Sequence, residues 1–194
     1  MLLQGKTAVI SGAASRRGIG LATAKAFAEQ GARVAILDLD LTAAHEAASS
    51  IGPDHLGLRC DVTDPEACKS AIAGVLGKFG QIDVLINNAG ITQPVKTMEI
   101  DPKSWERIMD VNLRGVLYLS QAVIPHMRSR GKGSIACMSS VSAQRGGGIF
   151  GGPHYSAAKA GVLGLAKAMA RELGPDGIRV NCVTPGLIET DITG

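Results

Sequence analysis

The sequence alternates short apolar segments with longer segments of helical periodicity along its whole length. The short segments are rich in β-branched residues and show little polar alternation, which is typical of strands buried on both faces; they span 7–11, 33–38, 55–60, 84–87, 134–139 and 179–183. Helical spacing covers 19–30, 41–51, 65–79, 105–127 and 155–173. Strict alternation of strand and helix implies right-handed crossovers and a parallel sheet. We therefore predict a doubly wound α/β fold with helices on both faces of the sheet.

Composition and charge exclude several classes of protein. The chain has 194 residues, 45% of them hydrophobic and 19% charged, which suits one globular domain over 1–194. The net charge of +3 comes without a basic patch, so we expect no nucleic-acid partner. An apolar stretch of membrane-spanning length and a secretion signal are both missing from the sequence, so we expect no membrane partner.

The four cysteines show no C-x-x-C spacing, and most lie in apolar or strand-like runs; they are Cys60, Cys68, Cys137 and Cys182. This pattern is typical of small buried thiols in a reducing compartment, and it favours neither a metal site nor a disulfide. Together with the missing membrane-spanning stretch and secretion signal, this pattern leads us to expect a cytoplasmic protein.

Ligands of open α/β sheets bind beyond the carboxyl ends of the strands, so the residues that follow each strand are the first candidates for function. After the first strand, Gly12, Gly18 and Gly20 precede a helix, a context that suits a phosphate cradle. The G-x-G-x-x-G fingerprint is absent because Thr23 occupies its third position, so a tight turn is the alternative. Asp38 ends the second strand eighteen residues beyond Gly20, close to the offset of an acidic residue that binds the adenosine ribose. The two features together predict a dinucleotide site.

Further polar motifs follow the later strands in a fixed order. They are Asp61-Val62, Asn87-Asn88-Ala89-Gly90, Asn112, Ser139-Ser140, Tyr155-Ser156-Ala157-Ala158-Lys159 and Pro185-Gly186. Each motif alone is weak, but the ordered set resembles the short-chain dehydrogenase/reductase family along the chain from Gly5 to Gly194. The resemblance implies a Rossmann-type sheet, a nicotinamide cofactor and an oxidoreductase that acts on a secondary alcohol or a ketone.

The resemblance also implies the cofactor-binding residues. Carried over position by position they are Gly12, Ser15, Arg17, Gly18, Ile19, Asp38, Asp61, Val62, Asn88, Ala89, Gly90, Tyr155, Lys159, Pro185, Gly186, Ile188 and Thr190, with no metal ligand. The loop departs from the family pattern, because Ser11 replaces the usual threonine and two extra residues lie between Gly12 and Gly18. The path of this loop over the pyrophosphate is therefore left open.

By the same resemblance the catalytic group is Ser140, Tyr155 and Lys159, with Asn112 holding a water that passes protons to solvent. Tyr155 and Lys159 are four apart on one helix face, so we expect the lysine to lower the tyrosine pKa and make it an acid/base near neutral pH. Ser140 would stabilise charge on the substrate oxygen. Ser142 has the usual spacing from Tyr155, but Ser140 is favoured because it directly follows the strand.

Other residues near these motifs have simpler interpretations. We expect His154 to be an incidental pocket or surface histidine, and Trp105 and Met109 to serve core or subunit packing. Arg145 and Phe150 are candidates for the mouth of the substrate site.

The cofactor is predicted to be NAD, with NADP less favoured. A carboxylate at Asp38 binds the ribose hydroxyls and repels a 2′-phosphate, whereas Arg16 and Arg17 argue for NADP. The loops 92–98 and 144–154 and the segment after Pro185 are expected to choose the substrate. A catalytically silent dinucleotide-binding sensor or scaffold is the alternative function, which the intact catalytic group disfavours.

Assembly and completeness rest on the resemblance alone. Family members are commonly tetramers or dimers that pair through long helices, here 105–127 and 155–173, and through a last strand. They are also longer than this chain, so we expect a single domain that lacks a C-terminal lid and strand.

Overall fold

A computed structural model describes residues 1–147 and 150–192 of the chain. Its six strands form one sheet in the order β3-β2-β1-β4-β5-β6, and every neighbouring pair is parallel. The strands are β1 (Thr7–Ser11), β2 (Arg33–Asp38), β3 (Leu56–Arg59), β4 (Val84–Asn87), β5 (Gly133–Met138) and β6 (Ile178–Val183). The order reverses between β1 and β4, which places a topological switch point there. The predicted doubly wound parallel sheet is confirmed.

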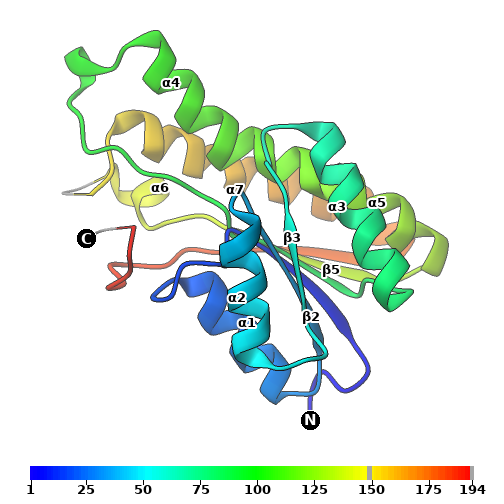
Figure 1. Ribbon diagram of the computed structural model, residues 1–194. Helices are drawn as coiled ribbons and strands as arrows, with labels where there is room; N and C mark the ends of the chain where they lie inside the picture. The colour runs from blue at the N-terminus through cyan, green and yellow to red at the C-terminus, as the bar shows by residue number, and fades with distance from the viewer. Residues whose placement is uncertain (148–149, 193–194) are drawn as a thin grey trace.

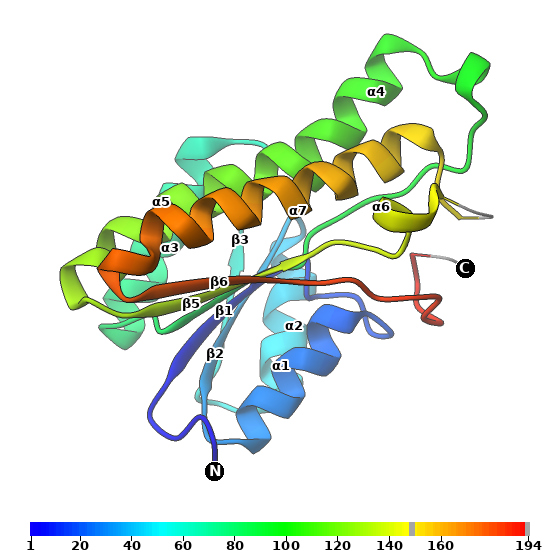
Figure 2. The same cartoon turned by 180° about the vertical axis from the view of Figure 1, so that it is seen from behind.

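Helices cover both faces of this sheet (Figures 1 and 2). On one face lie α1 (Ile19–Glu29) and α2 (Leu41–Ile51); on the other lie α3 (Pro65–Phe79), α5 (Gly115–Arg130) and α7 (Pro153–Leu173). Shorter elements connect them: η1 (Thr97–Glu99), α4 (Pro102–Met109), the π-helical segment η2 (Asp110–Arg114), α6 (Ser142–Arg145) and η3 (Gly174–Asp176). Each face has its own buried cluster, built around the alternating side chains of the strands.

Most predicted boundaries lie within one or two residues of the observed ones, but the helix predicted at 105–127 differs more. It begins at Pro102, because Asp101 caps it by accepting a hydrogen bond from the Ser104 N–H at 2.8 Å, and it continues through η2 to Arg130. Trp105 is 44% exposed, so of its two predicted roles the core one is wrong and subunit packing stays a prediction; Ile108 is the residue of α4 that is buried.

The cysteines are free thiols, and Cys60, Cys68 and Cys137 are buried, while Cys182 is partly buried. In the described ranges, no group of three or more histidine, cysteine or acidic side chains is placed to hold a metal ion. Within the same ranges, none of the helices has the length and apolar character needed to cross a membrane.

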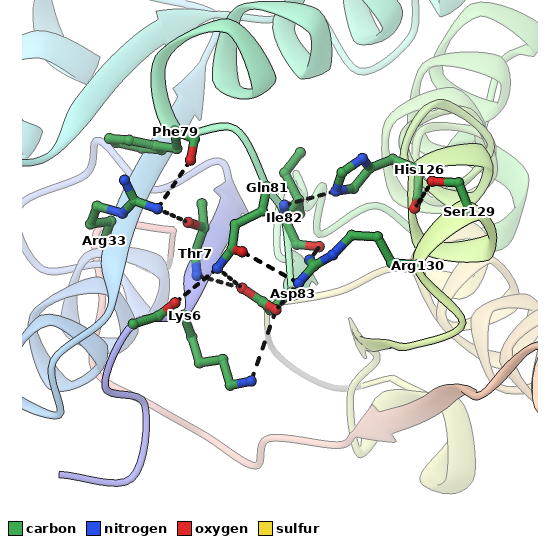
Figure 3. Close-up of polar contacts among 11 residues, drawn as sticks. Lys6, Thr7, Arg33, Phe79, Gln81, Ile82, Asp83, His126, Ser129 and Arg130 are labelled. Carbon is green, nitrogen blue, oxygen red and sulfur yellow. Dashed lines mark hydrogen bonds and ion pairs between the residues drawn. The ribbon is translucent and has the colours of Figure 1, made fainter.

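A buried carboxylate joins the amino ends of three strands (Figure 3). Asp83 accepts a hydrogen bond from the Thr7 N–H at 2.9 Å, and its backbone carbonyl accepts one from the Ser134 N–H at 3.0 Å. Arg130, from the end of α5, lies 3.1 Å from the Asp83 carboxylate, and Lys6 lies 4.0 Å from it. We call this group the Asp83 network. It anchors β1, β4 and β5 to one another and to α5 at the edge of the sheet opposite the strands' carboxyl ends.

His126 extends this anchorage. Its Nε2 accepts a hydrogen bond from the Ile82 N–H at 3.1 Å, directly before the Asp83 network (Figure 3). Burial and the nearby Arg130 guanidinium lower the His126 pKa, which keeps the ring in the neutral form that can accept this bond.

Candidate active site

A cavity of about 1250 Å³ opens at the carboxyl ends of the strands, at the switch point between β1 and β4. Its walls contain nearly all the site residues predicted from the sequence: Gly12, Ser15, Gly18, Ile19, Asp38, Asp61, Val62, Asn88, Ala89, Gly90, Asn112, Ser140, Tyr155, Lys159, Pro185, Gly186, Ile188 and Thr190. Arg145 and Phe150 line it too, and their role at a substrate mouth stays a prediction. Of the predicted site residues, Arg17 does not line the cavity.

The loop after β1 accommodates its two extra residues by folding against the sheet. The Gly12 N–H continues the ladder by donating to the Leu37 carbonyl at 2.7 Å, and Ala13 is fully buried in the cluster under α1 and α2. The Ala14 N–H then donates to Asp38 at 3.0 Å. The loop therefore places a backbone donor on the predicted ribose-binding carboxylate.

Two glycines of this loop permit close packing against the turn after β4. A Cβ on Gly12, which has φ +61°, would lie 2.6 Å from the Ala89 Cα. A Cβ on Gly20 would lie 2.7 Å from Nδ2 of Asn88, the nitrogen that donates to the Ser11 and Gly12 carbonyls. Since real Cβ contacts are never this short, both positions need glycine. The glycine-rich loop and the Asn88 turn thus form one rigid wall of the cavity.

Asp38 is oriented before any ligand binds. One carboxylate oxygen accepts from the Ala14 N–H, and the other accepts from the Leu39 N–H at 2.8 Å. Asp61 is held in the same way by Thr63, whose N–H and hydroxyl both donate to Oδ1 at 2.9 and 2.7 Å. The adenosine end of the predicted site therefore carries two carboxylates with fixed directions.

A carboxylate from the far end of the chain lies on the glycine-rich loop. Asp191 accepts a hydrogen bond from the Ser15 hydroxyl at 2.6 Å and another from the Arg17 N–H at 3.1 Å. These bonds lower the Asp191 pKa. The Arg17 guanidinium turns aside to pair with Glu189. The loop donors at the start of α1 therefore form a group that binds an anion, as a phosphate cradle must.

Ser140 and Tyr155 meet at the other end of the cavity. The Ser140 hydroxyl lies close enough to the Tyr155 phenol to have a lowering effect on the Tyr155 pKa, and it accepts a hydrogen bond from the Ser142 N–H at 3.1 Å. Ser142 instead begins α6. Of the two serines considered from spacing, Ser140 is the one whose hydroxyl interacts with the tyrosine.

Lys159 lies behind Tyr155, one turn further along α7. Its Nζ is 5.7 Å from the centre of the Tyr155 ring and donates to the Met138 carbonyl at 2.9 Å. Burial lowers the Lys159 pKa to about 8. The Tyr155 pKa is raised by burial, and the hydrogen bond from Ser140 opposes that shift only in part. The expectation that Lys159 lowers the tyrosine pKa is therefore wrong for this arrangement, because desolvation dominates at both groups.

Asn112 lies in the π-helical segment η2, a distortion common at functional sites. Its Nδ2 donates to the carbonyls of Ile91 and Ile108 at 2.9 and 3.0 Å, which fixes the side chain. Its Oδ1 is buried and has no hydrogen-bond partner among the described residues. A Cβ on Gly90 would meet both this oxygen, at 2.9 Å, and Lys159 Nζ, at 3.3 Å. Asn112 and Lys159 thus converge on one point of the cavity wall.

His154 differs from its expected place, because it lies neither on the surface nor in the cavity wall. It is fully buried, and its Nε2 lies 3.0 Å from Oε1 of Gln93. Gly148 and Ile149 of the predicted substrate loop lie outside the described residues.

Comparisons with known proteins agree with this geometry. Residues 12–194 match the family model described as enoyl-(acyl carrier protein) reductase. A short-chain type dehydrogenase/reductase of Sinorhizobium fredii is 70% identical over 198 residues, which cover 100% of this chain and 78% of the relative. The 3-oxoacyl-[acyl-carrier-protein] reductase of Vibrio cholerae is 39% identical over 193 residues, with the same two shares. The chain belongs to the short-chain dehydrogenase/reductase family.

Solved structures support the same assignment. The 3-ketoacyl-(acyl-carrier-protein) reductase of Brucella melitensis, crystallised with NADH, has a TM-score of 0.93 and 36% identity, covering 98% of this chain and 79% of its own. A short-chain type dehydrogenase/reductase of Mycobacterium marinum has the same TM-score and 37% identity, covering 98% of this chain and 76% of its own. The chain therefore belongs to a family of nicotinamide-dependent oxidoreductases.

Sequence reasoning missed three features of the site. The Met138 carbonyl that holds Lys159 has no sequence signal, because any residue supplies a carbonyl. Asp191 was also missed, since its contact with the loop depends on how the segment after Gly186 folds back. The pair of Gln93 and His154 could have been suspected only from the position of His154 beside Tyr155.

Proposed function

We propose that this chain is an NAD-dependent oxidoreductase that interconverts a secondary alcohol and a ketone, with Tyr155 as the general acid/base. The observation that carries the proposal is the meeting of Ser140, Tyr155 and Lys159 at one end of the cavity. The cavity exceeds the ~300 to 1,000 Å³ typical of a site for one small molecule, which leaves room for a cofactor and a substrate.

The described residues fit a nicotinamide dinucleotide. The glycine-rich loop already binds the Asp191 carboxylate through Ser15 and the Arg17 N–H, so it has the donors that a pyrophosphate requires. Asp38 and Asp61 would hold the adenosine end, and Asn88 to Gly90 would line the middle. Tyr155, Lys159, Ile188 and Thr190 would surround the nicotinamide end. When bound, the nicotinamide supplies or accepts the hydride.

Each catalytic residue has a role that its contacts support. Ser140 would donate a hydrogen bond to the substrate oxygen and stabilise the charge that develops there. Tyr155 would give a proton to that oxygen in reduction and take it back in oxidation. Lys159, held by the Met138 carbonyl, would place its positive charge behind the phenol, and its pKa of about 8 suits proton transfer near neutral pH. The unpartnered Asn112 Oδ1 would hold a water that connects Lys159 to solvent.

The preference for NAD over NADP rests on the groups around the ribose site. Both oxygens of Asp38 are fixed by backbone N–H groups, so the carboxylate would meet the ribose hydroxyls and repel a 2′-phosphate. The arginines that argued for NADP face other carboxylates: Arg17 pairs with Glu189, and Arg16 lies 4.0 Å from Glu46.

A screen of ketones and alcohols, coupled to NADH absorbance, tests the reaction. We expect turnover by the wild type, loss of turnover in Tyr155→Phe, and unchanged NADH binding in that variant. Tyr118→Phe is the matched control, because Tyr118 is the other tyrosine and packs against the core on α5. NADH binding without turnover of any carbonyl compound, or wild-type turnover in Tyr155→Phe, would refute the proposal. A tenfold preference for NADP in kcat/KM would refute the cofactor assignment.

Assembly is part of the proposal. The exposed indole of Trp105 on α4 supports its role in subunit packing next to the long helices α5 and α7. Sedimentation of the wild type and of Trp105→Ala measures it, and we expect a dimer or tetramer that the substitution weakens.

A further inference from the structure

His154 occupies an unusual place for a histidine beside a proposed catalytic tyrosine. It is fully buried in the first turn of α7, and its Nε2 lies 3.0 Å from Oε1 of Gln93. Because that oxygen can only accept, Nε2 carries the proton and Nδ1 is the unprotonated nitrogen. Nδ1 has no hydrogen-bond partner among the described residues. The single N–H of the neutral ring is therefore used in the hydrogen bond to Gln93.

Gln93 comes from the loop that continues from the cofactor turn Asn88 to Gly90, and more bonds join the same two segments. The Gly152 N–H donates to the Gln93 carbonyl at 3.0 Å, and the Thr92 hydroxyl donates to the Phe150 carbonyl. A Cβ on Gly152 would lie 2.7 Å from the Val95 carbonyl oxygen, so the backbones are in direct contact. We call residues 92–95 the bracing segment. It runs past the start of α7 (Figure 2).

The start of α7 depends on this contact because the helix has no side-chain cap. Gly152 is its N-cap residue and Pro153 follows, so neither side chain can bond the free N–H groups of the first turn. Tyr155 lies in that turn. The direction of its phenol is therefore set by what the turn packs against, and the bracing segment is the element that the side chain of His154 reaches.

We propose that His154 is a positioning residue: its hydrogen bond to Gln93 fixes the first turn of α7 on the bracing segment and so holds Tyr155 beside Ser140 and Lys159. The same bond, together with the one from the Gly152 N–H to the Gln93 carbonyl, joins the bracing segment to the start of α7. The effect of His154 on catalysis rests on the proposed function, but the position of Tyr155 can be tested without measuring turnover.

Two conservative substitutions separate a positioning role from a packing role. A glutamine at 154 places its amide nitrogen near the position of histidine Nε2, whereas an asparagine places it near Nδ1. His154→Gln therefore keeps a donor for Gln93, and His154→Asn loses it with a similar change in size and polarity. Gln93→Ala removes the same bond from the other side without touching α7.

Kinetics with the best substrate of the wild type give the first test. A displacement of a reacting group by about 1 Å can cost ~10²-fold in rate, so we expect kcat to fall ~10- to 100-fold in His154→Ala, His154→Asn and Gln93→Ala. NADH affinity should stay within about twofold, and His154→Gln should recover most of the rate. Combining His154→Ala with Gln93→Ala should add little, because both remove the His154–Gln93 bond and the other bond lost with Gln93, to the Ser104 hydroxyl, is long at 3.4 Å. Wild-type kcat in His154→Ala, or equal rates in the glutamine and asparagine variants, would overturn the proposal.

His126→Asn is the matched control, because its shorter side chain does not reach the Ile82 N–H. His126 also uses Nε2 in a hydrogen bond, but that bond lies at the opposite edge of the sheet. We expect this variant to lose stability without a change in kcat; an equal fall in kcat would show that the effect of His154 is general destabilisation.

Ionisation of Tyr155 gives a test that needs no turnover. In a Tyr118→Phe background Tyr155 is the sole tyrosine, so tyrosinate absorbance reports its pKa directly. His154→Ala should move that pKa, because the phenol leaves its buried place beside Ser140, and His154→Gln should leave it unchanged. A Tyr155 pKa that is the same in all three proteins would overturn the positioning role even if the proposed reaction holds. If the wild type has no turnover, a shifted pKa in His154→Ala still supports the geometry.

Discussion

Replacing Lys159 by methionine should inactivate the protein and, at pH 7, make it more stable. Lys159 is 4% exposed, and burial lowers its pKa from 10.5 to about 8. At ~1.36 kcal/mol per pKa unit, keeping this ammonium group charged inside the folded protein costs about 3 kcal/mol. Methionine removes that cost, but it also leaves the Met138 carbonyl without its donor, a loss of ~1 kcal/mol. The net expectation is a gain of about 2 kcal/mol in the free energy of unfolding.

The pH dependence gives this prediction its signature. Below pH 8 the lysine is charged in both the folded and the unfolded chain, so the full cost is present. Between about pH 8 and 10.5 the unfolded chain holds the proton and the folded one does not, so the stability of the wild type rises with pH relative to the variant. The advantage of Lys159→Met should therefore shrink steadily across that window and reverse near its upper end.

Urea unfolding at pH 7 and pH 9.5 measures the difference. Lys167→Met is the matched control, because Lys167 is exposed on the same helix; its effect should stay within ~0.5 kcal/mol at both pH values. Two results would refute this reasoning: Lys159→Met is less stable than the wild type at pH 7, or the difference in stability is the same at both pH values. Either would mean that burying the charged lysine does not cost folding free energy.

Three further predictions concern other parts of the fold. Gly12→Ala should lower the free energy of unfolding by ~1 to 3 kcal/mol in urea titrations, because the new Cβ meets Ala89 and the residue needs a positive φ; an unchanged midpoint contradicts the close packing. Asp191→Ala should tighten NADH binding a few-fold in fluorescence titrations, since it removes an anion from the loop donors, and high salt should reduce the difference; weaker binding contradicts the competition. Asp83→Asn should cost on the order of 2 kcal/mol of stability through its ion pair with Arg130, while NADH affinity stays the same; a change in affinity contradicts the separation of the two sites.

The fold could be predicted in detail because the alternation of apolar strand segments with helical segments is repeated along the chain. The strands β1, β2 and β4 are buried on both faces over most of their length, and helices begin or end at strong local signals such as Asp101-Pro102 or Gly131. The site residues could be predicted because a parallel sheet brings all carboxyl ends of its strands to one edge. Predicting the site therefore requires only the order of the motifs along the chain, and no knowledge of tertiary contacts.

The remaining features depend on contacts that no local pattern encodes. The Tyr155 pKa was expected to fall because spacing shows that Lys159 is near, but spacing does not show that both groups lose their water. His154 was expected at the surface or in the pocket, because its burial depends on a loop sixty residues earlier in the chain. The contact of Asp191 with the glycine-rich loop likewise depends on how a distant segment folds back.

The Asp83 network has a consequence for how such a protein can change. Its ion pairs and backbone bonds tie the strands together at their amino ends, while the cavity loops leave from their carboxyl ends. When the amino end of a strand is fixed by such bonds, a rearrangement of the loop at its carboxyl end moves the amino end little. The segment after Gly186 can therefore accept new sequences, and with them new substrates, without loosening the amino ends of the strands. The chain separates the part that must not vary from the part on which selection for a new specificity can act.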